Sequence, residues 1–405
     1  MKKYLFIAVA ALAASAACTQ VNVETPGSLI QFQAANYVPQ TKAIAADPTF
    51  TAFPCKAYMH AEGINLNDSY QPTQALGFQN FFGNEASGYT ETITYHAGTP
   101  VTWTPSHDYY WPKSTHSYIN FVGWYGKDSA GAASNPTVTY AWDSTASKYK
   151  ATLSWAFTQG ALGNVASDYL YADMAWRFNE NVDPATYTSV SRVDKGVPML
   201  FHHALAKINI KAYAVEESAT PANPAISAGS GTVSDGLATW TITLEDVQLT
   251  NVYTAGTLEM TNTDPATAST PQAWTKTGTG WTGTGSLSAL TPSTCTVDKV
   301  TQGTAVDLIA ETCVLPQDLA KSGSVSHLTG KVRIVTTYTN ATNSELIPFD
   351  LLLGTDLGTA TWEQNYKYTY YLKINPAQKK IYFDPAIESD YQDGTTTEQV
   401  IPDND

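Results

Sequence analysis

Short segments in which hydrophobic and polar residues alternate recur along the chain, with the period of two that marks a β-strand with one buried face. In residues 207–213, two isoleucines and an alanine fall on one face, while two lysines and Asn209 fall on the other. Residues 28–36 alternate in the same way, with Ile30 and Phe32 on the apolar face. Further strands are expected at 53–59, 118–125, 149–157, 240–249, 331–338, 346–353, 366–374 and 380–383.

Helical periodicity is rare, so the pattern predicts an all-β fold with helix confined to short pieces, such as one near residues 161–171. The turn sequence Asn-Pro-Ala-Gln at 375–378 predicts that the two strands flanking it form a hairpin. Tracts rich in Ser, Thr, Gly and Pro at 218–236 and 261–286 are expected to be long loops.

Composition adds that the polar surface carries few charges. Charged residues make up 14% of the chain, against roughly 25% in an average globular protein. Neutral hydroxyl residues on exposed strand faces are typical of β-sandwiches outside the cytoplasm. The formal net charge is −14, which excludes nucleic acid as a partner because phosphate binding needs a basic surface.

The first residues form a secretory signal. Lys2 and Lys3 precede an apolar run at 4–14, which is followed by small residues and Cys18. The apolar run is too short to span a bilayer. A Cys after small residues resembles the lipobox of bacterial lipoproteins, which implies that the mature chain begins at Cys18 and carries lipid on its thiol. The alternative is an ordinary signal peptide in which the cysteine is incidental.

The other cysteines suggest packing or cross-linking rather than metal chemistry. Cys55 shares an apolar strand face and is expected to be a small core residue. Cys295 and Cys313 lie in the same later region and could pair in an oxidising compartment. His202 and His203 are adjacent in a strand and point to opposite faces, so they cannot bind one metal ion together. We expect no metal site and no cofactor.

No catalytic motif stands out, so the sequence predicts a protein that is not an enzyme. The G-x-G-x-x-G match at 278–283 lies in a Thr/Gly-rich loop, without the helix that a dinucleotide site needs. A hydrolase on a β-sandwich would need a pair of carboxylates, and the sequence singles out none.

An aromatic cluster offers a second interpretation of function. Aromatic residues in one region could stack on sugar rings, although side chains of this kind more often pack in a core. They are Trp103, Tyr109, Tyr110, Trp111 and Trp124. The alternative function is therefore a surface glycan-binding lipoprotein that uses an aromatic platform.

Several loose motifs, taken in order, resemble a known family. They are Cys18, residues 30–32 followed by Gln-Thr-Lys-Ala at 40–43, and the segments 53–58, 109–112, 118–122, 201–208, 244–256, 314–317 and 362–368. This order is similar to that of the fimbrillin-like lipoproteins, the subunits of type V pili. The similarity spans nearly the whole chain.

The resemblance implies two transthyretin-like β-sandwich domains in tandem and assembly by strand exchange. A lipoprotein precursor would reach the outer membrane, and a trypsin-like protease would cut it between Lys42 and Ala43. The first strand, with Ile30 and Phe32 in its pockets, would then leave. A strand from the C-terminal end of another pilus subunit would fill the groove and extend the fimbria. A host protein or glycan is a further expected partner.

Together these observations predict the organisation of the chain. The first two segments are removed during export and processing, the next two are the sandwich domains and the last is an acidic tail. The expected segments are a signal peptide at 1–17, a propeptide with the exchangeable strand at 18–42, domains at 43–197 and 198–390, and a tail at 391–405.

Overall fold

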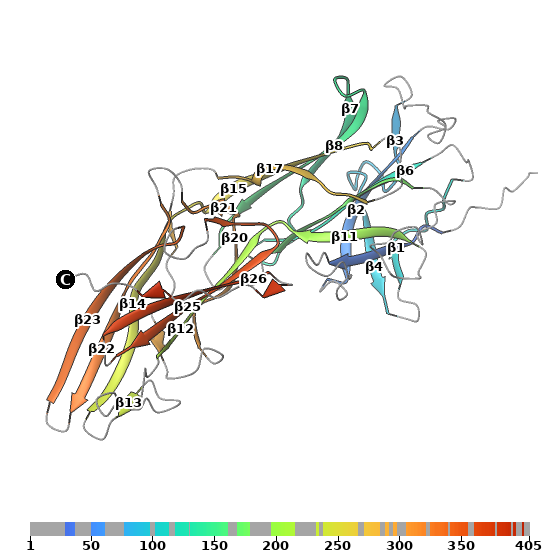
Figure 1. Ribbon diagram of the computed structural model, residues 1–405. Coiled ribbons are helices and arrows are strands. Elements are labelled where there is room, and N and C mark those ends of the chain that lie inside the picture. The colour runs from blue at the N-terminus through green and yellow to red at the C-terminus, as the bar shows by residue number, and fades with distance from the viewer. Residues whose placement is uncertain are drawn as a thin grey trace, which may run out of the picture.

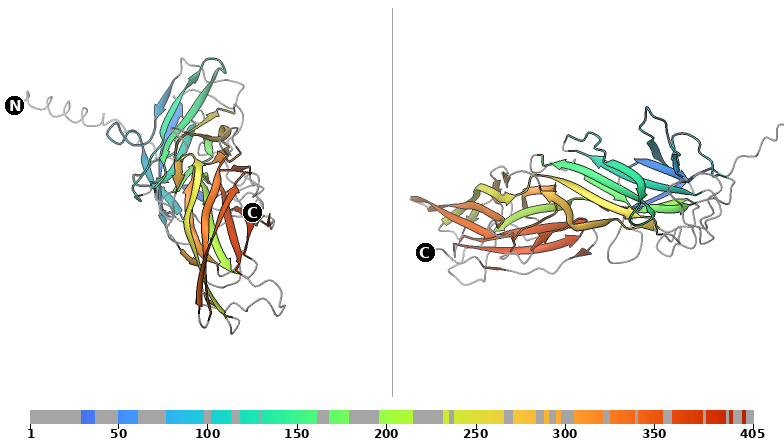
Figure 2. Two further views of the ribbon diagram at one scale, coloured as in Figure 1. Left: turned by 90° about the vertical axis from the view of Figure 1, so that its left-hand side faces the viewer. Right: turned by 90° about the horizontal axis from the view of Figure 1, so that it is seen from above.

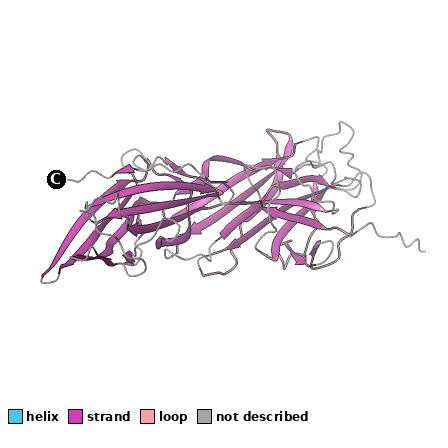
Figure 3. Cartoon of the chain, turned by 60° about the horizontal axis from the view of Figure 1, so that its bottom comes forward, coloured by secondary structure: helices cyan, strands magenta, loops and turns pink. Residues whose placement is uncertain are grey.

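A computed structural model describes the arrangement of the chain. The residues that it describes are 29–36, 50–60, 77–97, 102–112, 118–128, 130–160, 168–178, 196–214, 232–234, 238–265, 271–283, 288–290, 295–297, 305–320, 325–338, 341–354, 360–376, 379–389, 392–393 and 399–400. Strands account for all the regular secondary structure of this part, as Figure 3 shows. The expected all-β class is confirmed.

The strands form an elongated molecule with two lobes arranged end to end (Figures 1 and 2). The first lobe contains a large sheet whose neighbouring strands run in the order β16, β10, β6, β9, β11, β1, β5, β4, β2, β3. These strands are β1 Phe32–Asn36, β2 Ala52–His60, β3 Phe78–Asn80, β4 Glu91–His96, β5 Thr102–Pro105, β6 Ile119–Lys127, β9 Asp168–Ala172, β10 Met174–Phe178, β11 Val197–His203 and β16 Pro271–Gln272.

An additional pairing between β6 and β2 closes this sheet on itself. Within the described residues, the closed ring consists of seven strands, namely β6, β9, β11, β1, β5, β4 and β2. Their inward side chains form the ring core, which includes Ile30, Phe32, Phe53, Cys55, Ile93, Trp103, Phe121 and Phe201. The ring core therefore receives side chains from β1 as well as from its neighbours.

A second sheet, which we call the outer sheet, covers the outside of the ring. It is made of β7 Thr137–Asp143, β8 Lys148–Thr158, β15 Ala255–Thr263 and β17 Thr275–Gly283, in the order β17, β15, β8, β7. Strand β8 shows why the sequence forms it, because Tyr149, Leu153 and Trp155 are buried and the lysines and hydroxyl residues between them are not. Strand β6, by contrast, lies between two layers and is buried on both faces.

The second lobe is a sandwich of two sheets with its own apolar core. One sheet contains β12 Ala206–Ala214, β20 Val306–Val314, β25 Tyr366–Asn375, β26 Lys380–Ser389, β27 Gln392–Asp393 and β28 Gln399–Val400. The other contains β13 Thr232–Ser234, β14 Ala238–Val252, β18 Ser288–Leu290, β19 Cys295–Val297, β22 His327–Tyr338 and β23 Ala341–Leu352. Strands β21 Gln317–Asp318 and β24 Thr361–Trp362 pair separately.

Every strand expected from alternation is present, and β25 and β26 form the expected hairpin. Three details differ. Residues 168–171, at the end of the segment expected to be helical, belong to β9 because Tyr169 and Leu170 are both buried and so fill both of its faces. Residues 275–283 are strand β17 and not a loop. Asn209, expected outside, is buried because β12 lies between β20 and β25 and is covered on both faces.

Strand pairing crosses the boundary expected near residue 197. Strand β11 pairs with β1 and β9 of the ring, and its last residue lies three residues before β12 of the second lobe begins. Strands β15 and β17 come later in the chain but lie over the first lobe, because β15 pairs with β8 and β17 pairs with β15. The two lobes are therefore joined by several chain crossings.

Candidate functional site

The first described strand is one of the seven strands of the ring and has a neighbour on each side. Strand β1 is parallel to β11, from Phe32 opposite Val197 to Asn36 opposite Phe201. On its other side it is antiparallel to β5, where Phe32 lies opposite Trp103. We call the space between β11 and β5 the slot, and residues 29–36 the leader segment. Figure 1 shows β1 beside β11 at the end of the molecule away from β22 and β23.

Alternate side chains of the leader segment point into the ring core. Ile30, Phe32 and Ala34 are 1%, 2% and 3% exposed, whereas Leu29 is 46% exposed. The Phe32 ring makes edge contacts with Phe53 and Phe121, at centroid distances of 6.2 and 5.3 Å. Burying side chains of this size stabilises a core by about 1.5–3 kcal/mol each. An extended chain with alternating apolar residues is therefore the kind of ligand that the slot accommodates.

The backbone of the leader segment is held unevenly. The β11 side is a continuous parallel ladder, extended by the amide of Val197 donating to the carbonyl of Gln31 at 2.8 Å. On the other side, β5 meets the leader segment at Phe32, and contact resumes where the amide of Ile30 donates to the carbonyl of Tyr109 at 2.8 Å. The β5 side is the less continuous of the two.

Gly196 allows the β11 side to approach closely. A Cβ at this position would lie 2.9 Å from the carbonyl carbon of Phe32 and 3.2 Å from the carbonyl oxygen of Gln31. Carbon atoms that are not bonded do not come so close. The absence of a side chain at Gly196 is thus a condition for the leader segment to lie where it does.

A carboxylate cluster lies behind the Tyr109 contact. We define the Glu91 cluster as Glu91, Thr92, Ser106, His107 and Tyr109. The Glu91 carboxylate accepts hydrogen bonds from the Tyr109 hydroxyl at 2.9 Å, from the Thr92 amide at 3.1 Å and from the Ser106 hydroxyl, and His107 Nδ1 lies 3.0 Å from Oε2. Burial favours a raised pKa for Glu91, but these hydrogen bonds outweigh it and the pKa is lowered.

Some predicted site residues lie outside the described residues. They are Cys18, Lys42 and Ala43, so lipidation and cleavage remain predictions. Cys313 is buried in the core beneath the outer sheet. The side chain of Cys295 is also outside what the structure describes, and its pairing with Cys313 stays a prediction. Cys55 is a buried core thiol, and burial raises its pKa well above the usual range.

The aromatic cluster does not form an exposed platform. Trp103 and Trp124 are each 2% exposed and belong to the cores. Tyr109 and Trp111 are half-buried against the ring core, and Tyr110 is the exposed member of the set. The cluster therefore acts mainly in packing, and the glycan-binding interpretation loses the surface on which it depended.

The two adjacent histidines face different aspartates. His202 Nε2 lies 2.9 Å from Asp173 Oδ1, and His203 Nδ1 lies 2.9 Å from Asp168 Oδ1. Each histidine thus has its own carboxylate partner. Among the described residues, no group of three His, Cys, Asp or Glu side chains is placed to hold a metal ion.

A buried polar network, not foreseen from the sequence, ties the outer sheet to the ring. The Arg177 guanidinium donates to both carboxylate oxygens of Asp264, with distances of 2.7 and 2.9 Å. The Arg177 amide donates to the side chain of Asn120 at 2.7 Å, and the Trp176 indole donates to Asn262 at 2.8 Å. These contacts hold β10, which pairs with β6 of the ring, against the end of β15.

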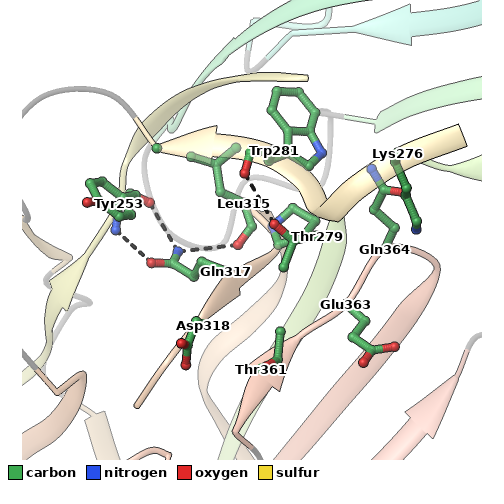
Figure 4. Close-up of a pocket in the computed structure, with 12 residues that line it drawn as sticks. Tyr253, Lys276, Thr279, Trp281, Leu315, Gln317, Asp318, Thr361, Glu363 and Gln364 are labelled. Atoms are coloured by element: carbon green, nitrogen blue, oxygen red, sulfur yellow. Dashed lines mark hydrogen bonds between the residues drawn. The ribbon is translucent and has the colours of Figure 1, made fainter. Parts of the chain in front are cut away.

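A cavity of about 620 Å³, lined by both polar and apolar residues, lies where the two lobes meet (Figure 4). Much of its polar wall is occupied by contacts within the protein. The Gln317 side chain holds Tyr253 through the Tyr253 amide, at 2.8 Å, and Lys276 Nζ donates to Gln364 Oε1 at 2.6 Å. Burial lowers the pKa of Lys276. These bonds join β17 and the segment before β15 to the second lobe, so the cavity lies within the lobe junction.

Comparison with known proteins decides the family. Residues 78–389 match the family described as fimbrillin-like. The chain belongs to the fimbrillin-like family. Membership agrees with the resemblance seen in the sequence, and it indicates a cell-surface protein that is non-enzymatic in kind and has partners in pilus assembly.

Solved structures of similar proteins come from Bacteroides species. A "putative cell adhesion protein" of Bacteroides uniformis has 17% identity and a TM-score of 0.40, with 90% of this chain and 98% of that chain covered. One of Bacteroides eggerthii has 12% identity and a TM-score of 0.32, with 93% of each chain covered. A "putative adhesin" of Bacteroides ovatus has 9% identity and a TM-score of 0.30, covering 95% and 98%.

No curated protein sequence matches this fimbrillin-like chain. In the part of the chain that the structure describes, no helix has the length and hydrophobicity needed to cross a lipid bilayer.

Proposed function

We propose that this fimbrillin-like protein is a structural subunit of a cell-surface fimbria that polymerises by protease-triggered strand exchange. The precursor is exported as a lipoprotein on Cys18 and reaches the outer membrane, and a trypsin-like protease cuts between Lys42 and Ala43. The leader segment then leaves the slot. In this proposal the two lobes correspond to transthyretin-like β-sandwich domains.

One observation carries the proposal: Ile30 and Phe32 are core residues of the leader segment, which belongs to the precursor but precedes the proposed cut. Removal of β1 would leave β11 and β5 with unpaired backbone groups and the ring core with empty pockets. An extended segment of another subunit can restore both the hydrogen bonds and the apolar contacts.

The shape of the molecule supports growth in one direction. The slot lies in the first lobe, and the tips of β22 and β23 lie at the opposite end (Figure 1). A contact between unlike surfaces of successive subunits does not close on itself, so it generates a filament. The donor is proposed to come from the C-terminal end, where β28 pairs with β26 at two positions, Val400 opposite Tyr382 and Gln399 opposite Phe383.

The test is limited trypsin treatment of the precursor, followed by N-terminal sequencing and by gel electrophoresis without boiling. We expect a new N-terminus at Ala43 and a ladder of oligomers that the uncut precursor does not form. Lys42→Gln should prevent both. Lys379→Gln, which removes an exposed lysine of the second lobe, is the matched control and should form ladders normally.

The result that would contradict the proposal is a product that begins at Ala43 and remains monomeric. Equal ladders from the Lys42→Gln variant and the wild type would also exclude Lys42 as the processing site. Size-exclusion chromatography of the same samples separates true polymers from aggregates.

A further inference from the structure

The β5 side of the slot is closed by a segment that leaves the sheet and returns to it. Strand β5 ends at Pro105, and its exposed continuation, Ser106 to Asp108, turns away before Tyr109 reaches the leader segment. There the Tyr109 carbonyl accepts from Ile30, and Tyr110 forms a bridge with Leu29. This contact depends on a turn and not on a continuous strand, so something else must hold Tyr109 in place.

Glu91 holds both ends of that turn. Its Oε1 accepts from the hydroxyl of Ser106 at the start of the turn, and its Oε2 accepts from the hydroxyl of Tyr109 at the end, at 2.9 Å. His107 Nδ1 approaches the same Oε2 at 3.0 Å. A single carboxylate on β4 thus fixes three positions within the four residues of this turn.

Because Glu91 is buried, its carboxylate depends on these hydrogen bonds. Glu91 is 4% exposed, whereas the side chain of His107 is 78% exposed. A buried carboxylate needs hydrogen-bond donors to offset its lost hydration. Here the donors come mostly from the turn that carries Tyr109, so the carboxylate and the turn keep each other in position.

Tyr109 also links the Glu91 cluster to the apolar part of the slot. Its ring lies 4.6 Å from the ring of Phe82, which lies 6.2 Å from the ring of Phe32. Its hydroxyl accepts from the Gly83 amide at 2.9 Å. Movement of Tyr109 would therefore disturb both the hydrogen bond to Ile30 and the wall of the Phe32 pocket.

We propose that Glu91 is a positioning residue for strand exchange: it holds Tyr109 against Ile30 and so keeps the β5 side of the slot closed. The slot then opens first on this side, while the parallel ladder to β11 holds longer. This inference rests on the proposed function for its role in assembly, but the local opening that it describes can be measured in the uncut precursor.

The experiment is hydrogen–deuterium exchange of the full precursor, with Glu91→Gln and Tyr109→Phe made singly and together. Because hydrogen bonds to charged groups are strong, Glu91→Gln should speed exchange at Ile30 by about tenfold or more. The amides of β14 and β22 in the second lobe should be unaffected. Glu245→Gln, which removes a carboxylate that pairs with Arg333 in the second lobe, is the matched control.

The double variant distinguishes positioning from general support. If Glu91 acts through the Tyr109 hydroxyl, the two changes are not additive, and the double variant exchanges little faster than Glu91→Gln alone. Additive effects, unchanged exchange at Ile30, or equal acceleration throughout the first lobe would each overturn the inference. Should Glu91→Gln fail to fold, Tyr109→Phe still has to speed exchange at Ile30.

A polymerisation assay distinguishes the positioning role of Glu91 from the proposed function. After trypsin treatment, Glu91→Gln should form ladders sooner than the wild type. If the wild type forms no ladders but Ile30 exchanges faster in Glu91→Gln, strand exchange fails and the positioning role stands. If the wild type polymerises and Glu91→Gln changes neither the exchange nor the ladder rate, the positioning role fails alone.

Discussion

Gly196 passes so close to the backbone of Phe32 that an added Cβ would lie 2.9 Å from the Phe32 carbonyl carbon. The restriction is one of space, because Gly196 is not among the residues with a positive φ. Gly196→Ala should therefore destabilise the precursor by about 1–3 kcal/mol, as overpacking does. Urea denaturation before and after removal of the leader segment tests this. The penalty should disappear once the leader is gone, and an equal penalty in both forms would contradict the assignment.

Phe32 and Leu29 offer a comparison within the leader segment itself. Phe32→Ala should lower the free energy of unfolding of the precursor by about 3–5 kcal/mol, because a fully packed ring is removed from the core. Leu29→Ala should change it by less than about 0.5 kcal/mol, because nearly half of Leu29 is exposed and it is not part of the ring core. Chemical denaturation of the two uncut variants measures the difference. Similar effects would show that the leader segment is not held by its inward side chains.

Low pH should loosen the β5 side of the slot. The pKa of Glu91 is lowered in the folded protein, so its charged form is favoured there. Its contribution is fully present above the ordinary glutamate pKa of about 4.3 and is lost as the pH falls through the lower folded value. Titratable groups that face Glu91 are Cys55 on β2, which lies opposite it in the sheet, and His107 and Tyr109.

The measurement is exchange protection at Ile30, corrected for intrinsic rates, as the pH is lowered from neutral. In the wild type, protection at Ile30 should decrease once the pH is lower than the ordinary glutamate pKa of about 4.3. The Glu91→Gln variant should lack this step, because it has no carboxylate to protonate at that position. A step of the same size in both proteins would assign it to another group.

The Arg177–Asp264 pair should be essential for holding the outer sheet on the ring. Both residues are almost completely buried, at 3% and 2% exposure. Arg177→Met would leave the Asp264 charge without its guanidinium partner, so we expect a loss of about 3–5 kcal/mol. Replacing both by apolar residues of similar volume should recover much of that loss. Denaturation of the single and double variants provides the test, and a double variant as unstable as the single one would argue against this account.

The sequence was most informative where one strand face is buried. Alternation predicted β8 and placed Ile30 and Phe32 on an apolar face, because a period of two is a local property. It could not show that β1 lies between β11 and β5, since those partners are far apart in the chain and pairing follows from tertiary packing.

The features that the sequence did not predict also depend on partners from elsewhere in the chain. The Thr/Gly-rich segment 275–283 looks like a loop, yet its neighbour β15 supplies the hydrogen bonds that make it strand β17. Glu91 gave no signal, because a single Glu between Thr90 and Thr92 has no motif and its partners come from residues 106–109. A buried carboxylate becomes recognisable only when the fold brings its donors together.

Closure of the ring has a consequence for how such a protein must be handled by the cell. A closed barrel that loses one strand exposes two unpaired strand edges at once, and both could pair with any extended polypeptide nearby. In the proposed mechanism, the uncut precursor avoids this because its leader segment occupies the slot and acts as an intramolecular chaperone. The time of cleavage would then be as important as its position, because the opened barrel would be protected only where the next subunit is already present.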